Sequence, residues 1–246
     1  MFARRASLVA VVIAMAGVPV DAGPGKISEI AAPEGFGRII TKDGSYSRFV
    51  QNLALKKDGK ILTWDGRENN FQGFDPIGVL KLPLLYKQDL EQCADWAMRL
   101  WSEHYKASGK LNKLVLFNYD GSKKPYRGAG QSYEKFLRLR MAYSNSHSLK
   151  KGTKAVKESD LIPGDLIVQN ETGGIGHVSV VMNVAASEGK PDVYLIGFSF
   201  MPAQEFHIER APAGYGVGGW FTMDGFRRYL KERLDLGEPV FRRFPE

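Results

Sequence analysis

The residue with the greatest capacity for covalent chemistry is the single cysteine, Cys93. It lies at the start of a segment whose apolar residues recur at helical spacing, and a helix N-terminus favours the thiolate form of a cysteine. Asp89 can cap this helix, Gln92 follows three residues later as in a capping box, and Gly109 can end it. A lone thiol in an exported protein is either buried and inert or kept for its reactivity. The position of Cys93 favours the second interpretation, a thiol nucleophile.

A base for this thiol is offered by His177, which begins a predicted strand of alternating residues. By the two-residue period of a strand, His177 shares one face with Ser179 and Asn183. The opposite, apolar face should point to the core, and it consists of Val178, Val180, Met182 and Val184. A lone histidine is more often structural, so the presence of Cys93 is what favours a role for His177 as the base.

The oxyanion formed by thiolate attack on an amide needs hydrogen-bond donors. The backbone N–H of Cys93 is one candidate, because the first amides of a helix lack intrahelical partners. Gln88 and Tyr86 could add side-chain donors, although a structural or substrate-contacting role suits both as well. In this scheme Cys93 attacks as the thiolate, and His177 accepts its proton and returns one to the leaving amine.

The order of predicted elements indicates an α+β fold with an antiparallel sheet, because most helices precede a series of consecutive strands. The predicted helices are 45–53, the segment that carries Cys93, 132–143 and 223–234. The predicted strands are 60–64, 113–119, 165–169, 178–184, 193–200 and 205–210.

Two segments together resemble the NlpC-type cell-wall peptidases and related papain-like thiol hydrolases. They are the cysteine that opens a helix, and Gly164-Asp165-Leu166 leading through a glycine-rich loop into His177-Val178. In that group the helix-borne cysteine is the nucleophile, the strand-borne histidine is its base, and a polar residue on the following strand orients the histidine. The resemblance implies a papain-like (NlpC-type) α+β fold in which the Cys-bearing helix packs on an antiparallel sheet.

A closer resemblance, from about Phe36 to the C-terminal region, is to the uncharacterised bacterial family called domain of unknown function 4846. The segments that carry it are Gly44-Ser-Tyr46, Leu90-Glu-Gln-Cys-Ala-Asp95, Met98-Arg-Leu100, Ala142-Tyr143, Gly176-His177 and Met201-Pro-Ala-Gln204. This family places a glutamine where the chain has Phe198. The third member of the site is therefore open between Ser199, Gln204 and His207.

Composition and charge exclude several classes. The chain has 246 residues and a formal charge of +7, but its lysines are scattered and no basic-aromatic groove is indicated, so we expect no nucleic-acid partner. Close-spaced zinc ligands, a phosphate-binding loop and a dinucleotide fingerprint are missing from the sequence, so we expect neither a metal nor a cofactor. The apolar runs after the N-terminal segment are too short for a membrane span.

Residues 1–22 have the pattern of a secretory signal peptide: Arg4 and Arg5, an apolar run, then Val20-Asp21-Ala22 as a cleavage site. An uncleaved anchor is the alternative. Residues 23–35, rich in Gly, Pro and Ala, are predicted to be a flexible lead-in, and 36–246 a single papain-like domain.

The sequence thus predicts an exported, periplasmic or extracellular thiol hydrolase (peptidase or amidase) that acts on envelope amide bonds such as peptidoglycan peptides. The alternatives are a catalytically inactive envelope-binding module of the same fold and a thiol acyltransferase. The partner expected is an envelope peptide or glycopeptide; the bond cleaved and the oligomeric state are not indicated.

Overall fold

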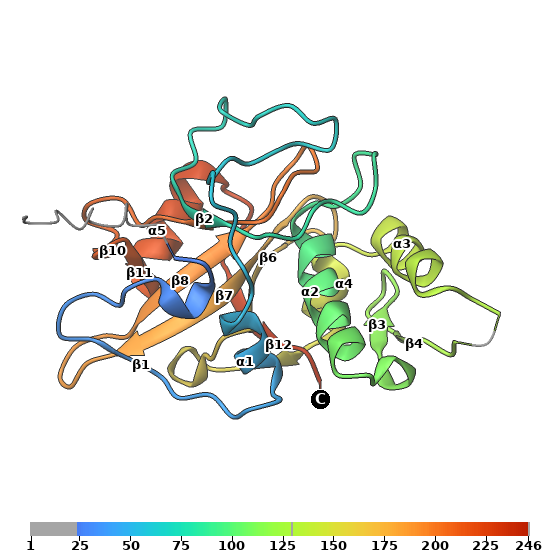
Figure 1. Cartoon of the computed structure of the whole chain (residues 1–246), viewed down its shortest axis with the longest axis horizontal. Helices are drawn as coiled ribbons and strands as arrows, with labels where there is room; N and C mark the ends of the chain where they lie inside the picture. The colour runs from blue at the N-terminus through green and yellow to red at the C-terminus, as the bar shows by residue number, and fades with distance from the viewer. Residues whose placement is uncertain (1–23, 129, 246) are drawn as a thin grey trace, which may run out of the picture.

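The computed structural model describes residues 24–128 and 130–245, and the predicted signal peptide 1–22 lies outside them. The described residues form a mixed α/β fold around a large antiparallel sheet with few helices (Figure 1). The centre of the sheet consists of β6 (Leu166–Gln169), β7 (His177–Ala186) and β8 (Val193–Phe198). The antiparallel α+β architecture expected from the sequence is confirmed at this level.

Shorter strands extend the sheet on both sides. These are β1 (Gly37–Arg38), β2 (Pro76–Val79), β5 (Lys154–Ala155), β9 (His207–Glu209), β10 (Gly216–Val217), β11 (Trp220–Thr222) and β12 (Val240–Arg243). The main order is β10-β11-β8-β7-β6-β12-β5, while β9 joins β8 to β2 and β1 pairs with the far end of β7. A separate hairpin consists of β3 (Val115–Phe117) and β4 (Lys123–Pro125).

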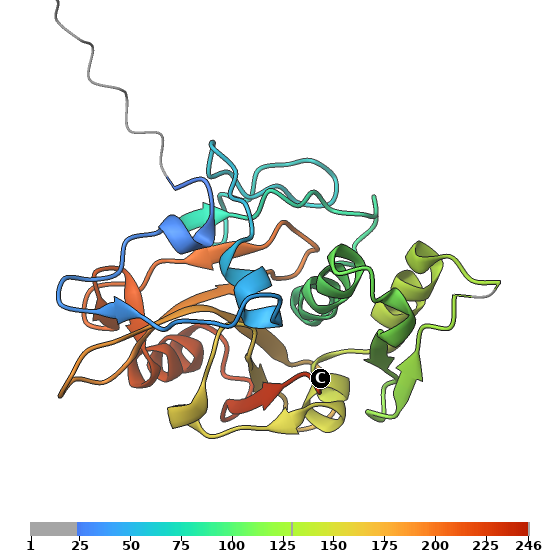
Figure 2. The same ribbon diagram turned by 60° about the horizontal axis from the view of Figure 1, so that its bottom comes forward.

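Helices cover the two faces of the sheet unequally (Figures 1 and 2). On one side lie α1 (Tyr46–Gln51), α2 (Cys93–Ala107) and α4 (Ser146–Gly152), and α3 (Tyr133–Tyr143) packs against α2 farther from the sheet. On the other side lies α5 (Met223–Arg233). Three short 3₁₀ helices complete the elements: η1 (Ile27–Glu29), η2 (Leu111–Lys113) and η3 (Glu158–Asp160).

Strand β7 separates two hydrophobic cores. Val178, Val180 and Met182 belong to the core beneath α1 and α2, as their spacing predicts. A bulge between Val181 and Asn183 then reverses the alternation. Val184 therefore packs in the core beneath α5, and the predictions for the faces of Val184 and Asn183 were wrong.

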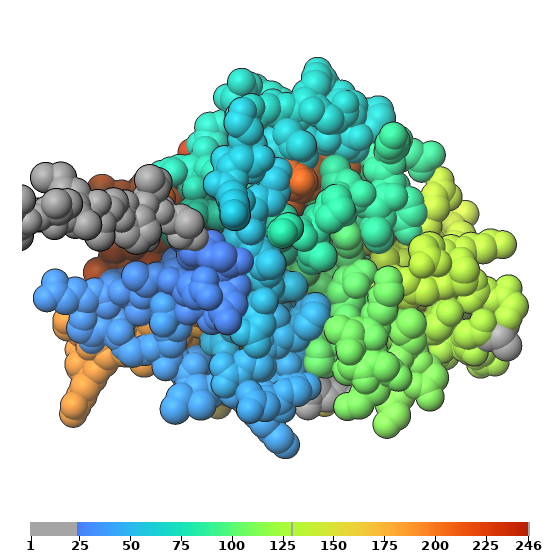
Figure 3. Space-filling model, viewed as in Figure 1, coloured from blue at the N-terminus to red at the C-terminus, as the bar shows by residue number. Residues whose placement is uncertain are grey.

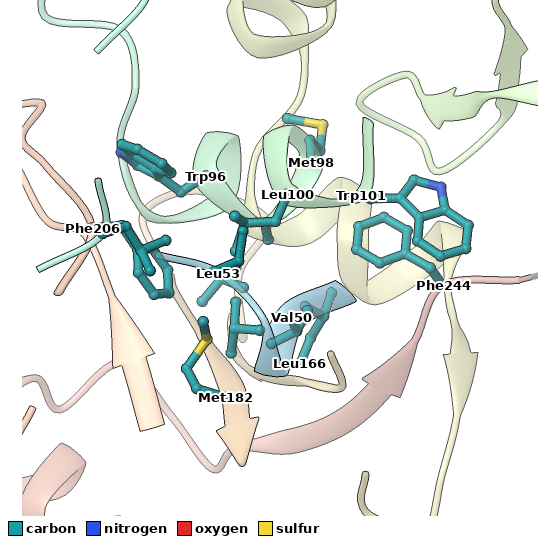
Figure 4. Close-up of a cluster of buried hydrophobic side chains, with 14 of the residues drawn as sticks. Val50, Leu53, Trp96, Met98, Leu100, Trp101, Leu166, Met182, Phe206 and Phe244 are labelled. Carbon is teal, nitrogen blue, oxygen red and sulfur yellow. The ribbon is translucent and has the colours of Figure 1, made fainter. Parts of the chain in front are cut away.

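The larger core is built on stacked aromatic and aliphatic side chains (Figure 4). Trp101 of α2 stacks on Phe244 with a centroid distance of 4.9 Å and an interplanar angle of 7°. The side chains of Val50 and Leu53 lie between α2 and the strands that carry Leu166 and Met182. This packing fixes α2, and with it Cys93, against one face of the sheet.

A buried ion pair positions the segment that leads into α2. Arg99 donates to Glu91 at 2.7 Å, and both side chains are almost completely buried. The second Glu91 oxygen accepts from the backbone N–H groups of Leu85 and Tyr86, while Arg99 also donates to the Pro83 carbonyl at 2.8 Å. In the space-filling view, the segment between α1 and α2, cyan to teal, covers the top of the molecule (Figure 3).

The N-terminal segment packs against the domain over the described residues 24–35. Ile27 is fully buried in the larger core, and its N–H donates to the Leu53 carbonyl at 3.1 Å. The indole of Trp220 donates to the Ala31 carbonyl at 2.9 Å. The predicted flexible lead-in, residues 23–35, therefore makes specific contacts with the domain over its described part, because Ile27 completes a core whose other members are distant in sequence.

Two further expectations differ from the structure. The predicted strand 60–64 makes only isolated bridges, Leu62 with Glu68 and Thr63 with Gln204. The helix that carries Cys93 begins at the cysteine itself and is not capped by Asp89, whose Oδ1 instead accepts from the Ala203 N–H at 2.6 Å.

The buried ion pair gives a stability prediction. Arg99→Ala should lower the free energy of unfolding by about 3–5 kcal/mol, because it leaves Glu91 buried without its counter-charge. Arg48→Ala, which removes an arginine paired with the exposed Asp43, should cost less than about 1 kcal/mol. Urea unfolding measures both, and similar losses in the two variants would contradict the role given to Glu91–Arg99.

Candidate functional site

A cavity of about 470 Å³ lies at the N-terminus of α2, and Cys93 forms part of its wall. The facing walls are the α3–α4 connection, the loop before β7, and the chain that follows β8; they contribute Ala142, Ser144–Ser146, Gly174–Gly176, Phe200 and Met201. Gly176 must be a glycine here, since a Cβ would clash with the Gln169 carbonyl and the Ser146 hydroxyl. A larger cavity of about 630 Å³ lies beside α5 and contains none of the predicted site residues.

The Cys93 thiol is buried at the first position of α2. The backbone N–H groups of Val178, Ala94 and Cys93 itself point to the sulfur and lower the pKa of the thiol. Burial outweighs them, and with a smaller contribution from the Asp95 carboxylate it raises the pKa of Cys93 to about 11. The lowered pKa expected from the helix position is therefore not found, and the thiol is protonated at neutral pH.

The His177 ring lies on the other face of the sheet. Its neighbour Val178 faces α2, so the imidazole is directed away and contacts Phe198 and Phe200 at centroid distances of 5.2 and 5.7 Å. Neither ring nitrogen has a hydrogen-bond partner among the described residues. Burial, with a smaller contribution from His207, lowers the pKa of His177 to about 3. The predicted Cys93–His177 hydrogen bond is thus not formed in this structure.

His177 instead belongs to a buried polar group beneath α5, which the sequence analysis missed. His207 Nε2 lies 3.2 Å from Glu209 Oε2, and Tyr229 of α5 donates to Glu209 Oε1 at 2.7 Å. The Ser179 hydroxyl and His207 Nδ1 have no partner among the described residues. The signal was the two-residue spacing in His177-x-Ser179 and His207-x-Glu209, which places each pair on one strand face.

Phe198 lies between the two histidines. Its ring centroid is 5.2 Å from that of His177 and 4.6 Å from that of His207. The family resemblance stated above implies a glutamine at this position, and an amide could hydrogen-bond an imidazole on either side. A phenyl ring offers neither donor nor acceptor, so the aromatic side chain accounts for the unpaired ring nitrogens.

Ser199 and Gln204 connect structural elements. Ser199 Oγ donates to the Gln204 carbonyl at 2.8 Å, and the Trp96 indole donates to the same oxygen at 2.9 Å. The Gln204 side chain bonds to Asn69 and Gln72, in the segment between α1 and α2. Their hydrogen bonds hold α2 and the 60–75 segment to the chain between β8 and β9, and none reaches Cys93 or His177.

Tyr86 and Gln88, expected near the oxyanion, contact α3 instead. The Tyr86 hydroxyl donates to the Glu134 carbonyl at 3.0 Å, and Gln88 Oε1 accepts from Arg138 at 2.8 Å. Neither side chain lies in the wall of the cavity. Both residues attach the segment before Cys93 to the neighbouring helix.

Comparison with known proteins identifies the family. The family model described as "Domain of unknown function (4846)" matches residues 27–128 and 118–234. The chain belongs to this family. No curated protein and no solved structure matches the chain.

Residues 24–128 and 130–245 contain neither a membrane-spanning helix nor a cluster of metal ligands. No helix there is long and apolar enough to cross a membrane. No group of three or more His, Cys, Asp or Glu residues there is arranged to hold a metal ion.

Because the Cys93 thiol is buried, we expect its alkylation to be slow. At pH 7, iodoacetamide should modify Cys93 roughly a hundred-fold more slowly than a free thiol, because a pKa near 11 leaves little thiolate. The rate should rise with pH and reach the free-thiol value in urea. His177→Phe should leave the rate at pH 7 unchanged, whereas rapid alkylation near pH 6 that is lost in this variant would establish a Cys–His pair.

Because the His177 imidazole is buried, we expect the stability of the folded protein to fall at acidic pH. The unfolded chain takes up a proton at His177 near pH 6.5 but the folded chain does so only near pH 3, so stability is present above about pH 6.5 and declines below it. His177 should therefore contribute a loss of up to about 1.4 kcal/mol per pH unit between pH 6 and pH 4.

Urea unfolding at several pH values measures this contribution as the difference between the wild type and His177→Phe. His147→Gln is the control, since His147 is half-buried and lies in α4, away from this polar group. Equal pH slopes in the wild type and His177→Phe would contradict the assignment.

Proposed function

We propose that the protein is an exported module that binds peptide segments of the cell envelope in the Cys93 cavity and does not cleave them in the conformation described. The observation that carries this proposal is the placement of the Cys93 thiol and the His177 ring on opposite faces of β7. A thiol peptidase needs a base within hydrogen-bonding reach of its sulfur. Here the sulfur is surrounded by backbone amides and stays protonated.

The papain-like relationship forms part of the proposal. Cys93 lies at the first position of a long helix that packs against central antiparallel strands, and this arrangement resembles that of NlpC-type enzymes. The chain keeps this arrangement while the histidine side chain is directed into the core beneath α5. The resemblance to such enzymes without the catalytic contact supports a binding role, and export rests on the pattern of residues 1–22.

The cavity has a composition that suits a peptide. Ile175 and Met201, at its rim, are 70% and 42% exposed, and Met141 and Phe200 add apolar wall inside. Polar wall atoms come from the Ser144–Ser146 connection and from the backbone of the loop before β7. Such a mixture of apolar surface and a few polar groups is typical of sites that hold small peptides or similar ligands.

A thiol hydrolase or acyltransferase is the second candidate, favoured by the three backbone N–H groups that surround the sulfur. Donors in this arrangement stabilise a thiolate or a nearby oxyanion. Activity would require a base to approach Cys93 when a ligand binds, and it would be abolished by Cys93→Ser.

Calorimetric titration with a soluble stem-type peptide, Ala-γ-D-Glu-Lys-D-Ala, tests the proposed function. Ala142→Trp places a large side chain in the cavity from the exposed surface of α3 and should weaken binding at least ten-fold. Ala107→Trp, at an equally exposed helix position outside the cavity, should bind like the wild type.

Mass spectrometry of the same mixtures separates the two candidates. The wild type should return the peptide intact, while cleavage that disappears in Cys93→Ser would establish the hydrolase. Binding that Ala142→Trp leaves unchanged would show that the cavity is not the binding site.

A further inference from the structure

Asp95, in the first turn of α2, has a buried carboxylate oxygen without a partner. Its Oδ2 accepts from the Gln92 backbone N–H at 3.0 Å, which completes the start of the helix. Its Oδ1 is inaccessible to solvent and makes no hydrogen bond to any described residue. The residue as a whole is 7% exposed and lies in the wall of the Cys93 cavity. Burial, with a smaller contribution from Glu91, raises the pKa of Asp95 well above its usual range. A positively charged donor from outside the chain would therefore both satisfy Oδ1 and favour the carboxylate form.

Other polar side chains of the cavity wall already have protein partners. Asn145 Oδ1 accepts from the backbone N–H groups of His147 and Ser148. Ser146 Oγ accepts from Asn170 at 2.9 Å. Compared with these groups, Asp95 Oδ1 retains its full capacity to accept a hydrogen bond.

The cavity wall has acidic but no basic side chains, in contrast to the basic composition of the whole protein. Although the chain carries a formal charge of +7, no lysine, arginine or histidine lies in the cavity wall. Its ionisable side chains are Asp89, the protonated Cys93 and Asp95, whose pKa burial raises well above its usual range. Asp89 is at the exposed entrance to α2, where its Oδ1 accepts from Gln92 and from the Ala203 N–H. Two aspartates without a nearby basic side chain in the wall favour a cationic ligand group.

We propose that this cavity recognises a primary ammonium group of its ligand, which donates a hydrogen bond to Asp95 Oδ1 and stabilises the ionised form of Asp95, while Asp89 supplies a second carboxylate at the entrance. The ligand class is therefore a peptide with a free amino group, such as the side-chain amine of a diamino acid. An ammonium fits because it offers three donors in a compact, positively charged group, whereas a carboxylate or phosphate would meet like charge. This inference rests on the proposed function and adds the chemistry by which the cavity selects its peptide.

Bound ammonium would also affect the neighbouring thiol. Asp95 is one of the groups that disfavour the Cys93 thiolate, and a cation beside Asp95 would offset that effect. The alkylation rate of Cys93 in the presence of ligand therefore reports on the same contact, provided that the ligand does not block the reagent.

The test compares two forms of one peptide on the wild-type protein. Both are Ala-γ-D-Glu-Lys-D-Ala with an acetylated N-terminus, one with a free lysine amine and one with Nε-acetyl-lysine. Calorimetry should show at least ten-fold tighter binding of the free amine, because a charged hydrogen bond at Asp95 is lost on acetylation. Asp95→Asn should reduce this preference to less than three-fold. Asp224→Asn, which changes an exposed first-turn acid of α5, should preserve it.

Each outcome discriminates between the proposals. If both peptides bind the wild type with equal affinity, the ammonium inference is overturned while the peptide-binding function stands. If neither binds, both fail. A preference that survives in Asp95→Asn would assign the ammonium to another acceptor. If Asp95→Asn does not fold, the wild-type comparison still decides whether the ammonium is recognised, and faster alkylation of Cys93 with the free-amine peptide than with the acetylated one would place the ammonium near Asp95.

Discussion

Successive side chains of a β-strand point to opposite faces of the sheet, and this constraint governs the relation between the two most reactive residues of the chain. Val178 is part of the core beneath α2, and its N–H points to the Cys93 sulfur. His177 precedes it by one residue, so its ring enters the core region beneath α5 and contacts Phe198. Cys93 thus lies beside the backbone of Val178, one residue from His177, yet the sheet separates the thiol from the imidazole.

Burial then determines the protonation state of both groups. In a thiol peptidase, the thiolate and imidazolium stabilise each other and so compensate for lost hydration. Without that contact, desolvation favours the neutral thiol at Cys93 and the neutral ring at His177. The same physical effect raises the pKa of Asp95 well above its usual range, and its Oδ1 has no partner among the described residues. The thiol of Cys93 and the imidazole of His177 are thus both uncharged at neutral pH.

Much of the fold could be predicted from local patterns, because the helices and central strands have clear periodicity and turn signals. Helix α3, with Ser132 as its N-cap, and strands β6 to β8 follow the predicted ranges closely. Strands of two residues, such as β1 and β10, have no local signal and depend on their partners. Strand β12 inserts between β6 and β5 from the far end of the chain, an arrangement that only long-range contacts decide.

The candidate site was harder to predict, because it depends on which face of the sheet α2 covers. The alternation in β7 correctly placed Val178 toward the core and His177 away from it. It did not show that the Cys-bearing helix lies over the Val178 face. This arrangement determines that the Cys93 thiol and the His177 ring do not meet. The unpaired oxygen of Asp95 likewise depends on what packs around the first turn of α2, which a capping pattern cannot indicate.

The central claim, that His177 is neutral and has no contact with the thiol, can be measured directly by NMR of the protein labelled with ¹⁵N in its histidine rings. With the His177 signals assigned from His177→Phe, the account predicts a neutral imidazole that does not titrate between pH 8 and pH 4.5. It also predicts that alkylation of Cys93 leaves those signals unchanged. An imidazole that titrates near or above neutral pH and whose pKa falls when Cys93 is alkylated would contradict the account and restore the catalytic pair.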